Sequence, residues 1–164
     1  MRIVVLAAAA ALAAGLASAA QAAPAAVDVT IGPALQAKAA KVYGAREVQL
    51  LADELKADVE RRLAKTGAYD GARVELVLAD AVPNRPTFKQ LGDRVGLSAL
   101  SFAVGGARIE GRIVTADGRV TPVAYRYYEN DIRYASGQST WADAEWTLDR
   151  FAYQLSRGQL VASR

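Results

Sequence analysis

The segment 45–66 spaces its apolar residues by three and four, and this pattern predicts one long amphipathic helix. The apolar stripe consists of Val48, Leu51, Ala52, Leu55, Val59 and Leu63. Gly67 follows the last turn, as the C-terminus of a helix favours. A helix with one apolar face has to bury that face, so the rest of the chain must supply a second layer.

Apolar runs on either side of this helix are predicted as strands. Residues 27–31 alternate apolar and polar side chains, as a half-buried strand does. Residues 73–80 are almost continuously apolar, which is typical of a central strand. The segment 33–44 stays ambiguous, although Pro33 can open a helix there and Gly44 can close it.

A hairpin is predicted over residues 98–128, and its apolar residues change parity at Gly105-Gly106. They are Leu100, Phe102 and Val104 before the glycine pair and Ala107, Ile109 and Ile113 after it. One inserted residue would restore a single buried face. We therefore predict a β-bulge at Gly105-Gly106.

The turn of this hairpin can be chosen by asking which register keeps the two faces separate. A two-residue Asp-Gly turn would pair Ile109 with Arg126 and mix the faces. A three-residue loop with a left-handed Gly118 pairs Ile109 with Tyr125, and the faces then agree. Pro122 indicates that the second strand lies at or near an edge of the sheet.

The last element is predicted as a helix from about Trp141 to Arg157, with Thr140 as its N-cap. Its buried stripe is expected to be Trp141, Ala144, Leu148, Phe151 and Leu155. The polar segment 129–139 is expected to be a loop. The connection 81–96 contains two prolines that argue against a regular helix or central strand, so it is either a plain surface loop or a functional one.

Strands and helices are segregated along the chain, which indicates an α+β fold. We expect one domain over residues 23–164, built on a small, mostly antiparallel sheet that contains the bulged hairpin. The long amphipathic helix and the C-terminal helix are expected to pack on one face of that sheet.

The N-terminus has the pattern of a secretory signal peptide over residues 1–22. Arg2 supplies the positive charge, an alanine-rich apolar run follows, and Ala20-Gln21-Ala22 is the preferred cleavage site. Ala17-Ser18-Ala19 is a second cleavage site, and an uncleaved membrane anchor is the alternative to cleavage. We therefore expect the protein in the periplasm, or secreted, with no membrane span after the signal is removed.

The sequence contains neither cysteine nor histidine, and this absence excludes several kinds of site. Disulfides, lipid attachment at a cysteine, Ser-His-Asp and Cys-His catalysis, and the usual zinc and copper sites all need one of these residues. The net charge is +3, of which Arg2 in the leader supplies one, and so mild a charge argues against a nucleic-acid partner. We expect no metal and no cofactor.

The hairpin also presents a polar face, opposite its apolar one. The candidates for binding an anionic ligand there are Arg108, Arg112, Arg126 and Tyr128. Arg108 is expected to face Arg126, and two facing cations repel each other unless an anion lies between them. The alternative is a solvated sheet face whose charge is neutralised by Glu110, Glu129 or Asp131.

On the last helix, Trp146 lies about 160° from the centre of the buried stripe, and Tyr153 falls within about 20° of Trp146. With Arg150 and Arg157 beside them, these residues have the composition of an interface hot spot. We expect this face to bind another envelope protein or a second copy of the chain. The alternative is that Trp146 packs under the 81–96 loop or against the N-terminal segment.

A non-catalytic binding module is therefore the leading interpretation, with no catalytic residue assigned. The alternative is a small hydrolase that acts on an envelope substrate through carboxylates. The acids available to it are Asp80, Asp143, Glu145 and Asp149. Such an enzyme needs at least two acids that converge in a pocket.

Four short motifs are spread over the chain after the signal peptide. They are Asp-x-x-Pro-Asn-Arg-Pro-Thr (Asp80 to Thr87), Gly-Gly-Ala (Gly105 to Ala107), Ala-Asp-Gly-Arg (Ala116 to Arg119) and Thr-Trp-Ala-Asp-Ala (Thr140 to Ala144). With the order of a signal peptide, a strand, a long helix and a β-rich half, they resemble families of exported proteobacterial domains without an assigned activity. The resemblance implies export and transfers no site residue.

Mass spectrometry of the exported protein should find an N-terminus at Ala23, or at Ala20 if the second site is used. The reason is that signal peptidase cleaves after a small residue that has another small residue two positions before it. Recovery of an intact chain that begins at Met1 from the membrane fraction would contradict cleavage.

Overall fold

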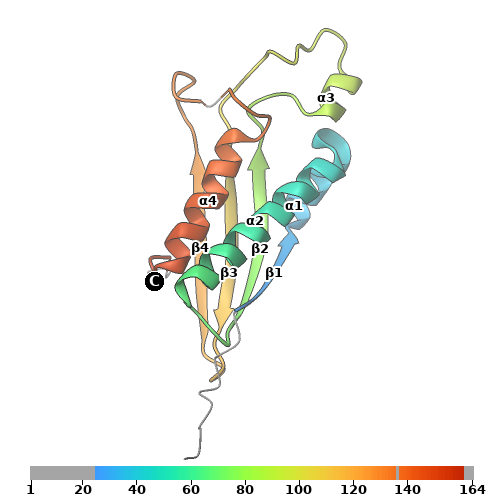
Figure 1. Ribbon diagram of the computed structural model, residues 1–164. Helices are drawn as coiled ribbons and strands as arrows, with labels where there is room; N and C mark the ends of the chain where they lie inside the picture. Colours follow the sequence, from blue (N-terminus) through green and yellow to red (C-terminus); the bar gives the residue numbers. More distant parts are fainter. Residues whose placement is uncertain (1–24, 136, 161–164) are drawn as a thin grey trace, which may run out of the picture.

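The computed structural model describes residues 25–135 and 137–160 (Figure 1). Its elements follow in chain order as β1 (Ala26–Ile31), α1 (Pro33–Lys38), the π-helical turn η1 (Ala39–Tyr43), α2 (Ala45–Thr66), β2 (Arg73–Val82), α3 (Phe88–Asp93), β3 (Gly106–Val114), β4 (Val120–Tyr128) and α4 (Ala142–Ser156). The predicted signal peptide lies outside the described residues.

The four strands form one sheet in the order β1-β2-β3-β4. β1 pairs with β2 in parallel, whereas the β2–β3 and β3–β4 pairs are antiparallel. A parallel pair needs a long crossover, and the helices between β1 and β2 supply it. The expected α+β fold with a mostly antiparallel sheet is confirmed.

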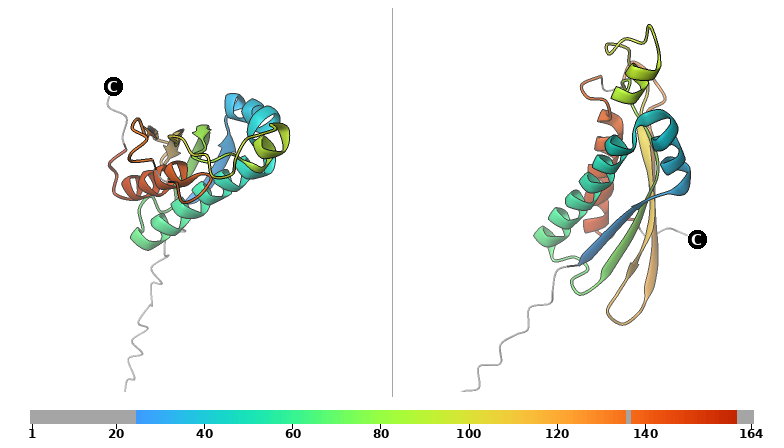
Figure 2. Two further views of the ribbon diagram at one scale, coloured as in Figure 1. Left: turned by 90° about the horizontal axis from the view of Figure 1, so that it is seen from above. Right: turned by 90° about the vertical axis from the view of Figure 1, so that its right-hand side faces the viewer.

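α2 and α4 lie side by side on one face of this sheet, and the opposite face is largely open (Figures 1 and 2). The predicted stripes of both helices are buried, with Leu55 on α2 and Phe151 on α4 completely inaccessible at 0%. Gly67 ends α2 in the left-handed conformation, at φ 65°. The core therefore lies between the sheet and these two helices.

The ambiguous segment 33–44 is helical. Pro33 stands at the first position of α1, and Gly44 ends η1 with φ 99°. Leu35 anchors α1 to the core at 0% exposure, while Lys38 in its last turn reaches Asp80 on β2 with a 2.8 Å ion pair. α1 therefore packs against β2 at this end of the sheet.

The β3–β4 hairpin has the predicted register, because Ile109 pairs with Tyr125. Gly118 has φ 80°, as the three-residue loop requires. β4 is the last strand in the sheet, so the prediction from Pro122 that it lies at an edge is also confirmed.

The β-bulge predicted at Gly105-Gly106 is wrong. The register between β3 and β4 runs without a shift from Gly106 onward, and the irregularity lies in β2, between Leu78 and Asp80. Gly106 is needed for a different reason, because a Cβ there would collide with the backbone and ring of Tyr128. The two strands approach each other too closely for any side chain at this position.

Two loops also differ from expectation. Residues 98–105 form no strand, and Leu100 and Phe102 are 80% and 51% exposed, so their alternation was not a sign of pairing. Within the 81–96 connection, β2 continues to Val82 and the short helix α3 follows. Thr87 caps that helix through a reciprocal capping box with Gln90, downstream of both prolines.

One buried side chain, Asn84, ties three segments together at this end of the sheet. Asn84 is 1% exposed, and its Nδ2 donates to the carbonyl of Ala103 at 3.1 Å and to Oδ2 of Asp143 at 2.5 Å. The same Asp143 oxygen accepts from the backbone N–H of Gly105 at 3.0 Å. The end of β2, the approach to β3 and the start of α4 are therefore joined, and we call Asn84, Ala103, Gly105 and Asp143 the hub.

The hub also replaces the predicted N-cap of α4. The N-cap of α4 is Trp141 rather than the predicted Thr140, and its side chain makes no capping bond. The carbonyl of Thr140 accepts from the N–H of Asn84 at 2.8 Å. The Oδ1 of Asn84 instead accepts from the N–H of Asp143, in the first turn of α4, at 2.9 Å. The capping oxygen therefore comes from a residue 59 positions earlier in the chain.

Replacing Gly118 by alanine should lower the free energy of unfolding by about 1 kcal/mol, because the left-handed region is unfavourable for a residue with a Cβ. Gly92 in α3 is the matched control: a Cβ at either glycine meets no atom within 4 Å, but only Gly118 has a positive φ. Gly92→Ala should leave stability unchanged or raise it. Equal effects in urea denaturation would contradict the assignment of the turn.

Asn84→Ala should lower the free energy of unfolding by about 3 kcal/mol, because it removes three buried hydrogen bonds, to the carbonyl of Ala103 and to the carboxylate and N–H of Asp143. Asn130→Ala is the control, since Asn130 is exposed. Urea denaturation followed by circular dichroism would measure both. If the two variants lost the same stability, the hub would not hold the fold together.

Candidate functional site

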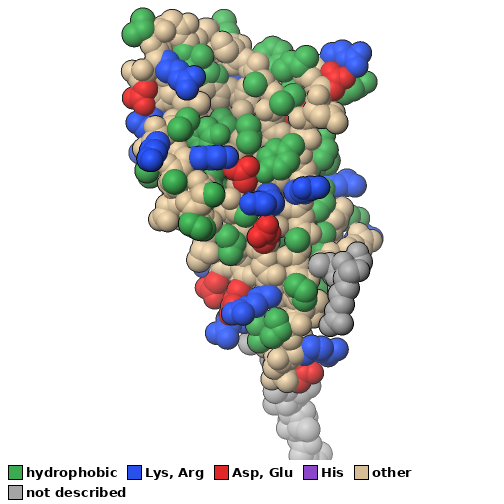
Figure 3. Space-filling model, turned by 180° about the vertical axis from the view of Figure 1, so that it is seen from behind, with side chains coloured by type: hydrophobic (Ala, Val, Ile, Leu, Met, Phe, Trp, Pro, Cys, Tyr) green, Lys and Arg blue, Asp and Glu red, His purple; other side chains and the backbone are tan. Residues whose placement is uncertain are grey.

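The open face of the sheet carries a row of charged residues across three strands. Asp80 on β2 pairs with Arg108 on β3, and Arg108 pairs with Arg126 on β4, so the predicted facing of the two arginines is confirmed. Figure 3 views the molecule from this side and shows basic and acidic side chains interleaved over the sheet. Outward side chains at facing positions of neighbouring strands lie close enough to act on one ligand.

Two of the four residues predicted to bind an anion already interact with acidic residues. Arg112 forms a 2.6 Å ion pair with Glu75 on β2. The hydroxyl of Tyr128 donates to Oδ2 of Asp80 at 2.8 Å. Burial raises the pKa of Tyr128, and the hydrogen bond to Asp80 raises it further. Tyr128 can reach across to β2 because Gly106, which it faces on β3, has no side chain.

Asp80 is therefore held from two sides. Its Oδ1 accepts from Lys38 at 2.8 Å, and its Oδ2 accepts from Tyr128. The hydrogen bond to Asp80 raises the pKa of Lys38. Sequence reasoning missed both Asp80 and Lys38 as members of this face, because neither lies in the hairpin.

The positive charges of the remaining two candidates, Arg108 and Arg126, are compensated weakly or not at all by acidic side chains. Arg108 approaches Glu110 only at 3.5 Å, and among the described residues Arg126 makes no ion pair or hydrogen bond. The other two expected neutralising groups are used elsewhere: Asp131 pairs with Arg133, and Glu129 accepts from Tyr127. A hollow of about 290 Å³ opens beside Arg108, Glu110, Ala124 and Arg126.

The outward surface of α4 forms the second candidate site. It consists of Trp146, Asp149, Arg150, Tyr153 and Arg157, with Arg62 of α2 alongside, and we call it the α4 crest. Trp146 is 47% exposed and Tyr153 is 38% exposed. All four predicted interface residues are thus brought together on one surface.

Cations hold both aromatic rings of the crest in place. The guanidinium of Arg150 lies 5.4 Å from the centroid of Trp146. Arg157 and Arg62 lie 4.7 Å and 5.4 Å from the centroid of Tyr153. Arg62 also forms a 2.5 Å ion pair with Asp149. Cation–π contacts of this kind favour these orientations of the two exposed rings.

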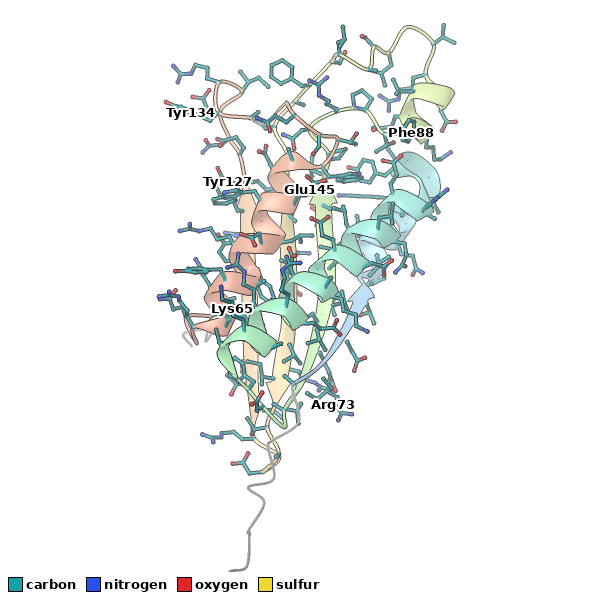
Figure 4. All side chains as sticks on the ribbon, in the orientation of Figure 1. Lys65, Arg73, Phe88, Tyr127, Tyr134 and Glu145 are labelled. Carbon is teal, nitrogen blue, oxygen red and sulfur yellow. The ribbon has the colours of Figure 1, made fainter. Side chains whose placement is uncertain are left out.

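Trp146 does not pack under the 81–96 loop. Its inner side rests on Tyr127 of β4, with ring centroids 4.7 Å apart, and Figure 4 shows Tyr127 beside α4. The hydroxyl of Tyr127 donates to Glu129, and this bond raises the pKa of Tyr127 to about 12. Sequence reasoning placed Trp146 outward but missed this tilted ring contact, because Tyr127 lies on another element.

The carboxylates of the hydrolase alternative do not gather in one place. Asp143 belongs to the hub and Asp80 to the open sheet face. Glu145 and Asp149 do line a hollow of about 680 Å³ between α2 and α4, together with Glu54 and Asp58. Within it, Asp149 pairs with Arg62.

Glu54 and Asp58 are the acids in this hollow that sequence reasoning did not single out. Burial raises the pKa of Glu54, and the nearby carboxylates of Glu145 and Asp58 raise it further. Asp58 is itself paired with Arg61, and Glu145 accepts from Ser139 at 2.9 Å. In the described part of the chain, no three acidic side chains come together in a way that could hold a metal ion.

The helices of the described residues are all too short or too polar to cross a membrane. No protein-family model and no curated protein matches the sequence. Among solved structures, a minor lipoprotein from Acinetobacter baumannii is 13% identical with a TM-score of 0.37, and the match covers 85% of this chain and 96% of that one. A protein described as a lipoprotein, from Caulobacter crescentus CB15, is 16% identical with a TM-score of 0.30 over 82% of each chain. Scores this low carry no argument about the function of this chain.

Proposed function

We propose that the protein is an exported, non-catalytic binding module whose contact surface is the α4 crest. The observation that carries this proposal is the pair of exposed rings, Trp146 and Tyr153, each held by arginine. Tryptophan, tyrosine and arginine are the residues most enriched at the energetic centres of interfaces. Export rests on the signal-peptide pattern of residues 1–22.

The spacing of the crest favours a helix as the partner. Trp146, Arg150, Tyr153 and Arg157 recur at intervals of three and four, so they form a second stripe on α4, opposite the buried one. The stripe spans three helical turns, or about 17 Å. A stripe of this form is what an antiparallel helix packs against, with rings of one helix between side chains of the other.

Charge selects a second copy of the chain as the occupant. Asp149 and Arg150 stand at the centre of the crest, with Trp146 three residues before and Tyr153 three residues after them. An antiparallel pair centred there places Asp149 of each copy, which also pairs with Arg62 of its own chain, against Arg150 of the other, and Trp146 against Tyr153. This contact is self-complementary, as a two-fold interface has to be.

Sedimentation velocity over a range of concentrations would test this pairing. We expect the wild type to dimerise weakly, with a Kd on the order of 10 μM, because one pair of helices buries little surface. Asp149→Arg alone and Arg150→Asp alone should each be monomeric, since like charges then face each other. An equimolar mixture of the two variants should form a heterodimer, because both facing pairs are then of opposite charge: one is the wild-type pair and the other is reversed.

Asp70→Arg is the matched control, since it makes the same charge change at an exposed turn beyond α2 and should dimerise as the wild type does. Trp146→Ala should weaken the pair by about tenfold or more without a large loss of thermal stability. A wild type that stays monomeric at millimolar concentration would refute the proposal. Dimers that survive both single charge reversals would show that another surface is used.

A further inference from the structure

We propose that Arg108 and Arg126, on the open face of the sheet, bind a phosphate-class oxyanion. The site is independent of the α4 crest, because the two lie on opposite sides of the sheet (Figures 1 and 3). The two arginines are directly paired, few acidic groups compensate their charge, and a hollow opens beside them.

The pairing places the two arginines side by side on one face of the sheet. Arg108 and Arg126 are directly opposite each other on adjacent antiparallel strands. Residues in such positions have Cα atoms about 5 Å apart, and their side chains leave the sheet on the same face. Two guanidinium groups are thus held within reach of one small ligand, and their mutual repulsion falls when an anion binds between them.

The surrounding acids do not remove this repulsion. Asp80 is the β2 residue directly across from Arg108, and both of its oxygens are already engaged, by Lys38 and Tyr128. Glu110 lies 3.5 Å from Arg108, which is a loose ion pair. Arg126 makes no ion pair with any residue that the structure describes.

The shape of the site fits a small ligand. A hollow of about 290 Å³ is bounded by both arginines, Glu110 and Ala124. Ala124 faces Glu110 across the two strands, so its short side chain leaves space where the ligand would sit. A second long side chain at this position would fill the gap between the guanidinium groups and the sheet.

The number of donors favours phosphate over carboxylate. Each guanidinium presents a planar fork of N–H groups that binds two oxygens at once. Two forks are satisfied together best by an anion whose oxygens point in several directions, as the tetrahedral oxygens of phosphate do, whereas the two oxygens of a carboxylate lie in one plane. Inorganic phosphate meets this requirement fully, and the phosphodiester of an anionic lipid headgroup offers two charged oxygens and two weaker ester oxygens around the same tetrahedral phosphorus.

Titration of ¹⁵N-labelled protein with sodium phosphate, at constant ionic strength against chloride, would test the site. We expect shifts of the Arg108 and Arg126 backbone and side-chain signals that saturate with a Kd on the order of 1 mM. Arg126→Ala should weaken binding by about tenfold or more, and Arg126→Lys should recover only part of it, because lysine has no fork. Glu110→Gln should tighten binding, since it removes the competing carboxylate.

Arg112→Ala is the matched control. Arg112 lies on the same strand and the same face of the sheet as Arg108, so the variant also removes one positive charge from this face. Unlike Arg126, however, Arg112 is paired with Glu75. Its effect on phosphate binding should stay below about twofold, because distant exposed charges are screened at physiological salt. Equal losses in Arg112→Ala and Arg126→Ala would show that only net charge matters and would overturn the proposal.

Vesicle flotation distinguishes the two sources of the ligand. Binding to phosphatidylglycerol vesicles but not to phosphatidylcholine vesicles, lost in Arg126→Ala and kept in Arg112→Ala, would identify a lipid headgroup. Saturable binding of inorganic phosphate without vesicle binding would identify a soluble phosphate. If neither phosphate nor vesicles bind in an Arg126-dependent manner, the site does not exist.

Discussion

The hydrogen bonds between Asn84 and Asp143 hold one end of the molecule together, and both proposed surfaces depend on them. Asp143 stands in the first turn of α4, so the hub fixes where the crest begins. The N–H of Gly105, which bonds to the same Asp143 oxygen, directly precedes β3, so the hub also sets where Arg108 enters the sheet. A buried, fully paired polar cluster of this kind tolerates little displacement, because each unmade bond is expensive in a dry interior.

Elements whose signal is local could be predicted from the sequence. The stripe of α2, the helix α4 and the turn at Gly118 depend on spacing within one segment, and all three are confirmed. The alternation of Leu100 and Phe102 was equally local, but no strand lies beside that segment to pair with it. The irregularity lies in β2, where the buried residues are even-numbered before it and Ala81 is buried after it. This change of parity could not be seen in the sequence, because the segment is apolar almost throughout.

The candidate sites likewise combine features that one segment predicts with contacts between distant segments that it does not. Arg108 opposite Arg126 follows from the hairpin register alone, and Trp146 outward follows from the helical period. The contacts that other elements make with these residues cannot be predicted from either pattern. Lys38 and Asp80 meet 42 residues apart, and the hub joins residues 59 apart, so these contacts exist only once the sheet order is known. Three of the four short motifs in the sequence meet at the hub, which gives them a structural role rather than a chemical one.

The one-sided coverage of the sheet gives the molecule two unlike sides. α2 and α4 cover one face, and the charged opposite face is exposed to solvent (Figures 2 and 3). In the proposed pair, two crests meet in the middle, so the two sheets form the outer walls and their arginine sites point away from each other. Such an assembly cannot hold one flat surface with both sites. It can span the gap between two surfaces, and its reach is then set by the thickness of two sheets and four helices.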